Sequence, residues 1–422
     1  MGGAAGHMRH PFDLVSVKSG NDLIGIFESL KSLVNTAAEG LPNVKFDGSN
    51  VSFKVLETGE IAVDRGSYAD IPGITMSNVA GRFRDPKHGM RKAIPTVLRI
   101  MTLAKIEPEL RALGLYDNPH YFLNAEYAES GTINATAYSG NYIFIHGVNS
   151  FYENTFRGVT RPGIPKPLGY NPKKGKDAPV SEKSVEVPYD KQALALLVKK
   201  ANEVAQQFDP PFNVVGPVPV SKKAQINYGP ALSESITIPL SPEYLDQYPE
   251  VAALQGGSLK NWLRAIEKKP AQYYAPLYDV EIPLLSGGKI NPYHKNTYVS
   301  VVENGTLADS IVPPEHVRTL IDGMIILHAT RKLGHQFLSG LTSDFGDMIL
   351  LNKKEGETDH EGVVIRNPAY GQYPFKITGE FIVTGMGGAF GAKMNAPPST
   401  PATVSESYLK KLIRESIRRV IS

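Results

Sequence analysis

The chain has 422 residues and a mass of 46.0 kDa, enough for about two domains and a sizeable core. Hydrophobic residues make up 41% and charged residues 21%, which excludes wholesale disorder and collagen-like fibres. The absence of cysteine excludes disulfides, cysteine-ligated zinc, iron–sulfur clusters and a cysteine nucleophile. The formal net charge of +3 confines any basic surface to a local patch.

The composition and the first eight residues give expectations about where the protein is located and which residues fold. No apolar run approaches the ~18 residues of a membrane span, so we expect no membrane partner. A chain without cysteine suits a reducing compartment, and a cytoplasmic location is expected. Residues 1–8 (MGGAAGHM) have the composition of an expression scar rather than of a folded element.

The first half of the chain predicts a helix, a hairpin, a basic helix and further strands. Residues 22–35 repeat apolar side chains at the period of one helix face, namely Leu23, Phe27, Leu30 and Val34. Two strand-like runs follow between residues 43 and 64, with Thr58-Gly59 as their turn. The next predicted elements are a basic helix over 87–115 and strands over 121–127 and 142–148.

The second half begins with residues 157–183, where repeated prolines and lysines predict a long exposed loop or linker. Residues 225–300 mix the patterns of strands and turns, so the succession of elements there is not predicted. The remaining predicted elements are a helix from Leu194 to Val204, a strand at 214–220, a helix after Pro314, and strands at 347–351, 362–366 and 375–384. A capping box, Thr403–Glu406, predicts a basic amphipathic helix over 409–420.

The tetrad Lys45-Phe46-Asp47-Gly48 is the first candidate for chemistry. It precedes the predicted hairpin, where rigid backbone would hold a nucleophilic lysine in place. An amine attacks only when it is unprotonated, so neighbouring cations, a metal or desolvation would have to lower its pKa. A surface lysine before an Asp-Gly turn is the alternative interpretation.

Glu361 and Lys376 are the second and third candidates. Glu361-Gly362 opens a buried-looking strand, where a carboxylate is well placed to hold Mg²⁺ near phosphates and a glycine lets a ligand approach the backbone. Lys376 lies in an apolar strand and must extend to solvent or meet an anion. An ordinary turn before the strand and an ordinary surface lysine are the alternatives.

Taken in order, these residues and three more resemble the motifs of the covalent nucleotidyltransferase superfamily, which includes ATP-dependent DNA ligases, RNA ligases and mRNA capping enzymes. The matching positions are Lys45-Phe46-Asp47-Gly48, Arg65, Glu126, Phe144, Glu361-Gly362 and Lys376. The resemblance implies an α+β fold: an ATP-grasp-like nucleotidyltransferase core of antiparallel sheets flanked by helices, with a large insertion and a small helical C-terminal part.

The resemblance also implies a role for each matching residue. Lys45 would become the lysyl-AMP adduct, with Asp47 and Gly48 completing its motif. Arg65 would lie on the far strand of the hairpin and contact phosphate or the 3′ side of the substrate. The remaining roles concern the nucleotide and its metal: ribose contact by Glu126, purine stacking by Phe144, Mg²⁺ binding by Glu361 and α-phosphate contact by Lys376.

The chain departs from the family pattern in three places. Thr378 stands where a second lysine is usual, which puts one phosphate contact in doubt, and Ala125 replaces the glycine before Glu126. More than 200 residues separate Phe144 from Glu361, far more than the family core needs. The expected division is therefore a core over 9–150 and 347–385, an insertion of unknown role over 151–346, and a linker with a basic helix over 386–422.

Among the members of the superfamily, the layout is most similar to RNA ligases of the phage and editing type. DNA ligases and capping enzymes carry an OB-fold barrel after the last motif, and too few residues follow Lys376 for its five strands. The expected activity is joining of RNA 5′-phosphate and 3′-hydroxyl ends with ATP and Mg²⁺, as in RNA repair. A DNA nick ligase, and a catalytically degenerate nucleic-acid-binding or structural protein, remain the alternatives.

Basic segments fit a nucleic-acid partner, RNA rather than DNA. The lysines of 157–183 and the helix at 409–419 would contact phosphates, and some of the 20 tyrosines could stack on bases. His328 and His335 share a predicted helix face without an acidic neighbour, so no metal site is expected there. The glycines at 385–391 lack the setting of a phosphate-binding loop.

Overall fold

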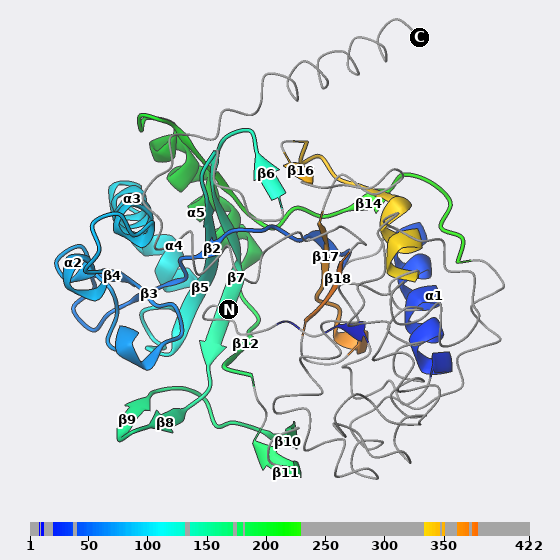
Figure 1. Ribbon diagram of the computed structural model, residues 1–422, viewed down its shortest axis with the longest axis horizontal. Helices are drawn as coiled ribbons and strands as arrows, with labels where there is room; N and C mark the ends of the chain where they lie inside the picture. Colours follow the sequence, from blue (N-terminus) through cyan, green and yellow to red (C-terminus); the bar gives the residue numbers. More distant parts are fainter. Residues whose placement is uncertain are drawn as a thin grey trace, which may run out of the picture.

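The computed structural model describes residues 8, 10–11, 20–36, 40–130, 136–171, 175–179, 182–228, 333–346, 348–350, 361–370 and 374–378. Within these ranges the chain is α+β, as expected. A larger and a smaller sheet lie side by side in Figure 1, with helices on their outer faces. Apart from residues 8 and 225–228, the expected scar at 1–8, the order of 225–300, the helix after Pro314 and the C-terminal helix lie outside the described residues.

The larger sheet is mainly antiparallel and is built around the long strand β7 (Asn141–Phe151). In the described chain it contains β2 (Ser49–Asn50), β3 (Phe53–Val55), β4 (Ile61–Val63), β5 (Tyr121–Ala128), β7, β12 (Ser184–Glu186) and β13 (Phe212–Val215). Only β13 runs parallel to β7 among these pairs. The predicted hairpin is confirmed as β3–β4, and Gly59 in its turn has a φ of +81° that favours glycine.

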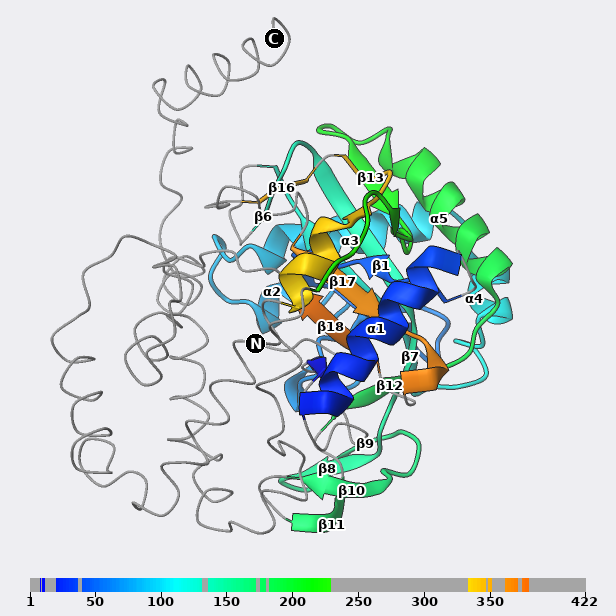
Figure 2. The ribbon, with the colours of Figure 1, turned by 90° about the vertical axis from the view of Figure 1, so that its right-hand side faces the viewer.

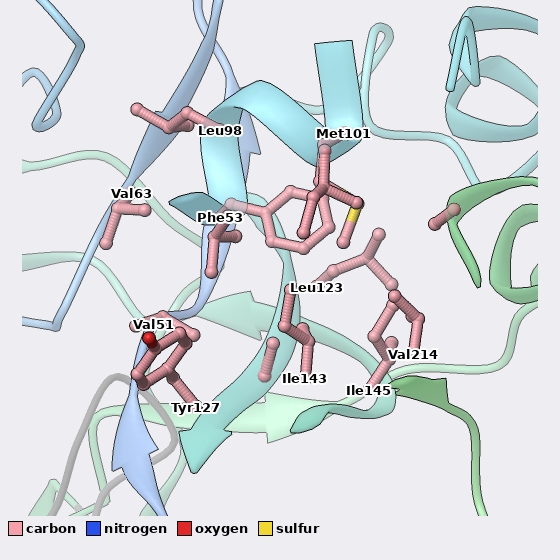
Figure 3. Close-up of a cluster of buried hydrophobic side chains, with 14 of the residues drawn as sticks. Val51, Phe53, Val63, Leu98, Met101, Leu123, Tyr127, Ile143, Ile145 and Val214 are labelled. Carbon is pink, nitrogen blue, oxygen red and sulfur yellow. The ribbon is translucent and has the colours of Figure 1, made fainter. Parts of the chain in front are cut away.

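One face of the larger sheet carries the first hydrophobic core. The helices α3 (Met90–Leu103), α4 (Glu107–Ala112) and α5 (Lys191–Ala205) cover this face. Figure 3 shows Phe53, Leu123, Ile143 and Val214 from the strands packing together with Met101 from α3. Side chains alternate between the two faces of a strand, so the neighbours of Ile143 and Ile145 in sequence point toward the other sheet.

The smaller sheet joins segments far apart in the sequence. Its strands are β1 (Asn43–Val44), β17 (Gly362–Ile365) and β18 (Phe375–Thr378), and all are antiparallel. Helix α1 (Gly20–Thr36) covers one face of this sheet, beside a helical segment at 333–339 (Figure 2). The predicted inner face of α1 is confirmed, because Leu23, Phe27 and Leu30 are fully buried.

The basic helix predicted over 87–115 is in fact two helices, α3 and α4. The chain turns between them at Lys105, which adopts a left-handed φ of 50°. Pro108 lies in the first turn of α4, a position where its missing N–H costs no helical hydrogen bond. A short helix, α2 (Val79–Arg82), precedes them. The sequence did not reveal this break, because the apolar residues keep a helical spacing on both sides of it.

The prediction of a long loop or linker at 157–183 was also wrong. Two hairpins occupy most of it: β8 (Asn154–Phe156) with β9 (Val159–Arg161), and β10 (Leu168–Asn171) with β11 (Gly175–Pro179). Pro162, Pro165 and Pro167 fall between the hairpins rather than inside a strand, so they do not interrupt the pairing.

The larger sheet extends beyond residue 150, where the first part of the core was expected to end. Strand β7 continues to Phe151, and β12 and β13, from the region expected to be an insertion, pair with it. The predicted strand at 214–220 is β13, which begins earlier and ends before Pro217. Short pairs complete the described sheet structure: β14 (Ser221–Lys222) with β15 (Leu341–Thr342), and β6 (Thr136–Tyr138) with β16 (Met348–Leu350). None of the helices in the described part is long and apolar enough to cross a membrane.

Candidate active site between the two sheets

Lys45 lies where the chain passes from the smaller sheet to the larger one. Val44, the last residue of β1, pairs with Val363, and the Lys45 backbone N–H donates to the Gly362 carbonyl at 2.8 Å. Four residues later, Ser49 pairs with Tyr127 in the larger sheet. Both ends of the crossing are therefore anchored in sheet hydrogen bonds, and the tetrad at 45–48 spans the space between them.

The amine of Lys45 contacts the carboxylate of Glu361. Its Nζ atom lies 2.5 Å from Glu361 Oε2, and only 19% and 10% of the two side chains are exposed. Burial lowers the pKa of Lys45, but Glu361, Asp47 and Glu126 raise it, and the net effect is a pKa above the ordinary value. In this arrangement Lys45 is an ammonium ion held by its acidic neighbours, and an ammonium ion does not act as a nucleophile.

Glu126 is the third carboxyl of the group, and its pKa is strongly raised. Burial raises the pKa of Glu126 to about 8, with Asp47 and Glu361 adding to the rise while Lys45 and a hydrogen bond from the Gly48 backbone oppose it. Its Oε2 atom is buried and has no hydrogen-bond partner within the described chain. A buried polar atom of this kind is a place where a ligand hydroxyl would satisfy a lost hydrogen bond.

Asp47 and Gly48 fix the path of the crossing. The Asp47 backbone N–H donates to Tyr138 Oη at 2.8 Å, and Asp47 Oδ2 accepts from the Thr136 backbone N–H at 3.3 Å. A Cβ on Gly48 would lie 3.0 Å from the Tyr127 carbonyl oxygen and 3.1 Å from Glu126 Cβ. Glycine therefore allows the crossing to approach β5 closely enough to bring Lys45 near Glu126.

Gly362 has a different role from the one expected. The sequence suggested that a glycine beside Glu361 leaves room for a ligand, but a Cβ there would meet the Ile377 carbonyl oxygen at 2.1 Å. The backbone of β18, not a ligand, occupies that space. The close pairing holds β17 and β18 together directly behind Glu361.

Lys376 lies on the same face of the smaller sheet as Lys45. Lys376 in β18 is paired with Val364 in β17, and Thr378 in β18 is paired with Gly362 in β17. Opposed residues share a face, as do residues two apart in one strand, so Lys45, Lys376 and Thr378 point away from the core under α1. That face looks toward the larger sheet.

Phe144 is brought to the site but is covered. It is paired with Glu126 across β5 and β7, and it is fully buried. The Phe46 ring lies 4.0 Å from it, almost parallel at 5°. A purine could stack on this face of Phe144 only after Phe46 moves, so Phe46 occupies the expected base position in the structure.

Arg65 lies at the edge of the site rather than beside Lys45. It follows β4, and its Nε donates to the Asn50 carbonyl at 3.1 Å, while Asn50 pairs with Glu126. Burial lowers the pKa of Arg65, with Asp70 opposing and Arg82 adding to the effect. Asn50 of β2 therefore connects Arg65 with Glu126.

Sequence reasoning missed two features next to the site. His146 lies two residues after Phe144, and its Nε2 is 3.9 Å from Glu126 Oε1. Burial, followed by Arg366 and Lys45, lowers the pKa of His146 to about 3, so it is neutral near pH 7. The strand period that put Phe144 on this face would also have found His146. Arg366 and Glu186, 2.7 Å apart, join the two sheets, and no local pattern indicates that ion pair.

The carboxyl groups fit a magnesium ion that nucleotide phosphates would help to hold. Glu361 is the carboxylate in contact with Lys45, and Mg²⁺ in such sites ordinarily takes one or two carboxylates together with phosphates and water. Within the described ranges, no group of three His, Asp or Glu side chains lies close enough to hold a metal alone.

Comparisons of the chain with protein-family models, with curated proteins and with solved structures found no match.

Proposed function

We propose that the protein is an ATP-dependent polynucleotide ligase that forms a lysyl-AMP intermediate on Lys45. The observation that carries the proposal is the buried contact between Lys45 Nζ and Glu361 Oε2, with Asp47 and Glu126 nearby. These residues come from both sheets, and the resemblance assigns the same residues to adenylyl transfer. The α+β architecture, with a crossing between two mainly antiparallel sheets, is compatible with a nucleotidyltransferase core.

In the first step, Lys45 Nζ gives its ammonium proton to solvent, attacks the α-phosphorus of ATP, and loses a second proton to solvent as the N–P bond forms. An N–P bond forms, the bond from the α-phosphorus to the bridging oxygen breaks, and pyrophosphate leaves. Lys376, on the same sheet face, would meet the α-phosphate. Magnesium bound by Glu361 and the phosphates would offset both the developing charge and the field that raises the pKa of Lys45.

Stacking of the nucleotide base on Phe144 requires the Phe46 ring to move. The Phe46 ring covers Phe144, and both are held in a parallel stack. A purine that displaces Phe46 would gain the Phe144 face, and the Glu126 carboxyl, with its unpartnered Oε2, would accept or donate to a ribose hydroxyl. The protein then contributes orientation and electrostatics, and the substrate supplies the reacting groups.

Two further steps complete the proposed reaction. The adenylyl group moves from Lys45 to a 5′-phosphate, and a 3′-hydroxyl then attacks that phosphate so that AMP leaves. Arg65, at the edge of the site, would hold a phosphate of the polynucleotide. RNA ends are the proposed substrate, and nicked duplex DNA is the alternative to compare.

Label transfer tests the first step. The protein is incubated with Mg²⁺ and α-labelled ATP, denatured, and examined for label at 46.0 kDa. Label is expected with ATP in the native protein and not in Lys45→Ala or Lys45→Arg. Lys87→Ala is the matched control, because Lys87 is an exposed lysine elsewhere in the described chain.

The outcomes separate the alternatives. Label that survives in Lys45→Arg would assign another nucleophile, and no label in folded native protein that carries no AMP would favour a degenerate core. Once label transfer is seen, 5′-phosphorylated single-stranded RNA and nicked duplex DNA are compared as acceptors. Joining of the DNA alone would replace the RNA ligase proposal by a DNA nick ligase.

A further inference from the structure

The β8–β9 hairpin presents an exposed aromatic side chain. Phe156, the last residue of β8, is 51% exposed, and Val159, its partner in β9, is 45% exposed. The Phe156 ring stacks on Tyr68 at 5.2 Å and 25°, and Tyr68 begins the short helix η2 (Tyr68–Asp70). The hairpin projects from the end of β7 (Figure 1). Phe156 is exposed and Tyr68 is half-buried, so the pair does not fill a core.

Arg157 occupies a turn position that ordinarily selects against arginine. Arg157 and Gly158 join the strands, with φ values of +51° and +79°. Two-residue turns of this kind favour Asn, Asp or Gly at the first position, since a left-handed conformation strains a longer side chain. The guanidinium of Arg157 lies over Phe156, 5.2 Å from the ring centroid.

The hairpin is anchored rigidly to the loop that carries Arg65. Arg161, at the base of β9, is buried and donates to Asp64 Oδ2 at 2.8 Å and to the Ser67 carbonyl at 2.7 Å. Arg65 lies between these two partners in sequence. The aromatic pair is therefore fixed relative to the residue that borders the Lys45 site.

We propose that Tyr68, Phe156 and Arg157 form a platform that binds a nucleotide of single-stranded RNA beside the active site. An exposed aromatic ring with an adjacent guanidinium, that of Arg157, suits a base and its phosphate. The platform would hold the strand whose end reacts at Lys45. This inference rests on the proposed function for its substrate, but not for its test.

Binding is measured without catalysis, by fluorescence anisotropy of a short 3′-labelled single-stranded RNA in the absence of ATP. Phe156→Ala is expected to weaken affinity roughly 5- to 100-fold, the range for losing one base–aromatic stack. Arg157→Gly is expected to weaken affinity and to lower the dependence of log K on log salt by about 1. Glycine suits the left-handed turn, so this second variant tests the cation without straining the hairpin.

Two control variants remove similar exposed side chains elsewhere in the described chain. Arg111→Ala removes an exposed guanidinium that lies 4.0 Å from the Tyr116 ring, and Leu196→Ala removes an apolar side chain that is 45% exposed. Neither is expected to change RNA affinity. The same titrations with single-stranded DNA of equal sequence show whether the platform tolerates either sugar, and a loss on Phe156→Ala there also supports it.

RNA affinity that is absent in the native protein, or equal in Phe156→Ala, Arg157→Gly and both controls, would overturn the inference. Label transfer to Lys45 is measured separately and requires no RNA. If the native protein shows no lysyl-AMP yet Phe156→Ala weakens RNA binding, the proposed function fails and the platform stands. If lysyl-AMP forms and the variants bind RNA like the native protein, the platform fails alone.

Discussion

Lys45 and Glu361, 316 residues apart in the sequence, meet with Nζ and Oε2 separated by 2.5 Å. The contact exists because β1 pairs with β17, so the residue that follows one strand lies beside the residue that precedes the other. Burial strengthens the interaction between the two charged groups. An ammonium in low dielectric is held strongly by its carboxylate partner, and the same partner delays the loss of the proton that nucleophilic attack requires.

Glu361→Gln is expected to make the Lys45 amine more reactive toward a small acylating reagent while reducing label transfer from ATP. Burial lowers the pKa of Lys45, and Glu361 is the strongest of the neighbours that raise it. Removing the Glu361 charge leaves burial opposed only by weaker neighbours, so the pKa of Lys45 falls. A larger neutral fraction near pH 8 then follows. Mass spectrometry of the peptide that contains Lys45 measures the acylation rate.

The reactivity of Lys87 in the same sample is the internal control, because that lysine is exposed and far from Glu361 in the sequence. An unchanged ratio of Lys45 to Lys87 acylation in Glu361→Gln would contradict the electrostatic account. A parallel loss of both reactivities would show that the variant has unfolded or aggregated instead.

Glu126→Gln is expected to flatten the dependence of stability on pH. Burial raises the pKa of Glu126 from 4.5 to about 8, so the folded protein holds this proton more tightly than the unfolded chain. Stability from this group is complete below the unfolded value and declines as the pH rises through the folded value. The variant should therefore be more stable than the native protein at about pH 8.5 and similar at about pH 5.

Urea denaturation at the two pH values measures the difference between the proteins. Comparing the proteins with each other removes the contribution of all other titrating groups. If the native and variant midpoints move in parallel between the two pH values, Glu126 is ionised in the folded protein and the assignment is wrong.

Gly48→Ala is expected to destabilise the protein by about 1–3 kcal/mol and to lower label transfer further than stability alone explains. A Cβ would press on the Tyr127 carbonyl oxygen and Glu126 Cβ, and backbone cannot retreat as a side chain can. Gly25→Ala is the matched control: it lies exposed in α1 with nothing within 4 Å and should stabilise by about 0.5–1 kcal/mol. Thermal unfolding and label transfer are measured on both, and full activity of Gly48→Ala would remove the argument for a close crossing.

Asp64→Asn is expected to cost about 3–5 kcal/mol, because it leaves two buried cations without their carboxylate. Asp64 is fully buried and contacts Lys54 Nζ and Arg161 Nη1, each at 2.8 Å. Glu107→Gln, which breaks an exposed pair with Arg111, should change the free energy of unfolding by less than about 1 kcal/mol. Equal losses in the two variants would show that the Asp64 cluster is solvated.

Local periodicity predicted the elements that bury one face by themselves. The inner face of α1, the β3–β4 hairpin and the strands β5 and β7 follow from apolar spacing and a turn glycine, and these signals are short-range. Apolar spacing also predicted one helix where the structure has α3 and α4. A single left-handed residue such as Lys105 ends a helix but leaves the helical spacing on either side intact. Sequence patterns also assigned the β8–β9 hairpin to a loop, because these short exposed strands lack an alternating apolar pattern.

The chain by itself determined which residues carry reactive groups: Lys45, Asp47, Glu126 and Glu361 were all singled out by residue type and order. Only the tertiary structure decided which of them meet, that Glu126 is protonated and Lys45 ionised near neutral pH, and that Phe46 covers Phe144. Pairing across 316 residues and the degree of burial depend on the whole fold, and burial sets the strength of charge interactions. The buried links of Arg161 to Asp64 and of Arg366 to Glu186 arise in the same way, since no local pattern encodes a contact between distant strands.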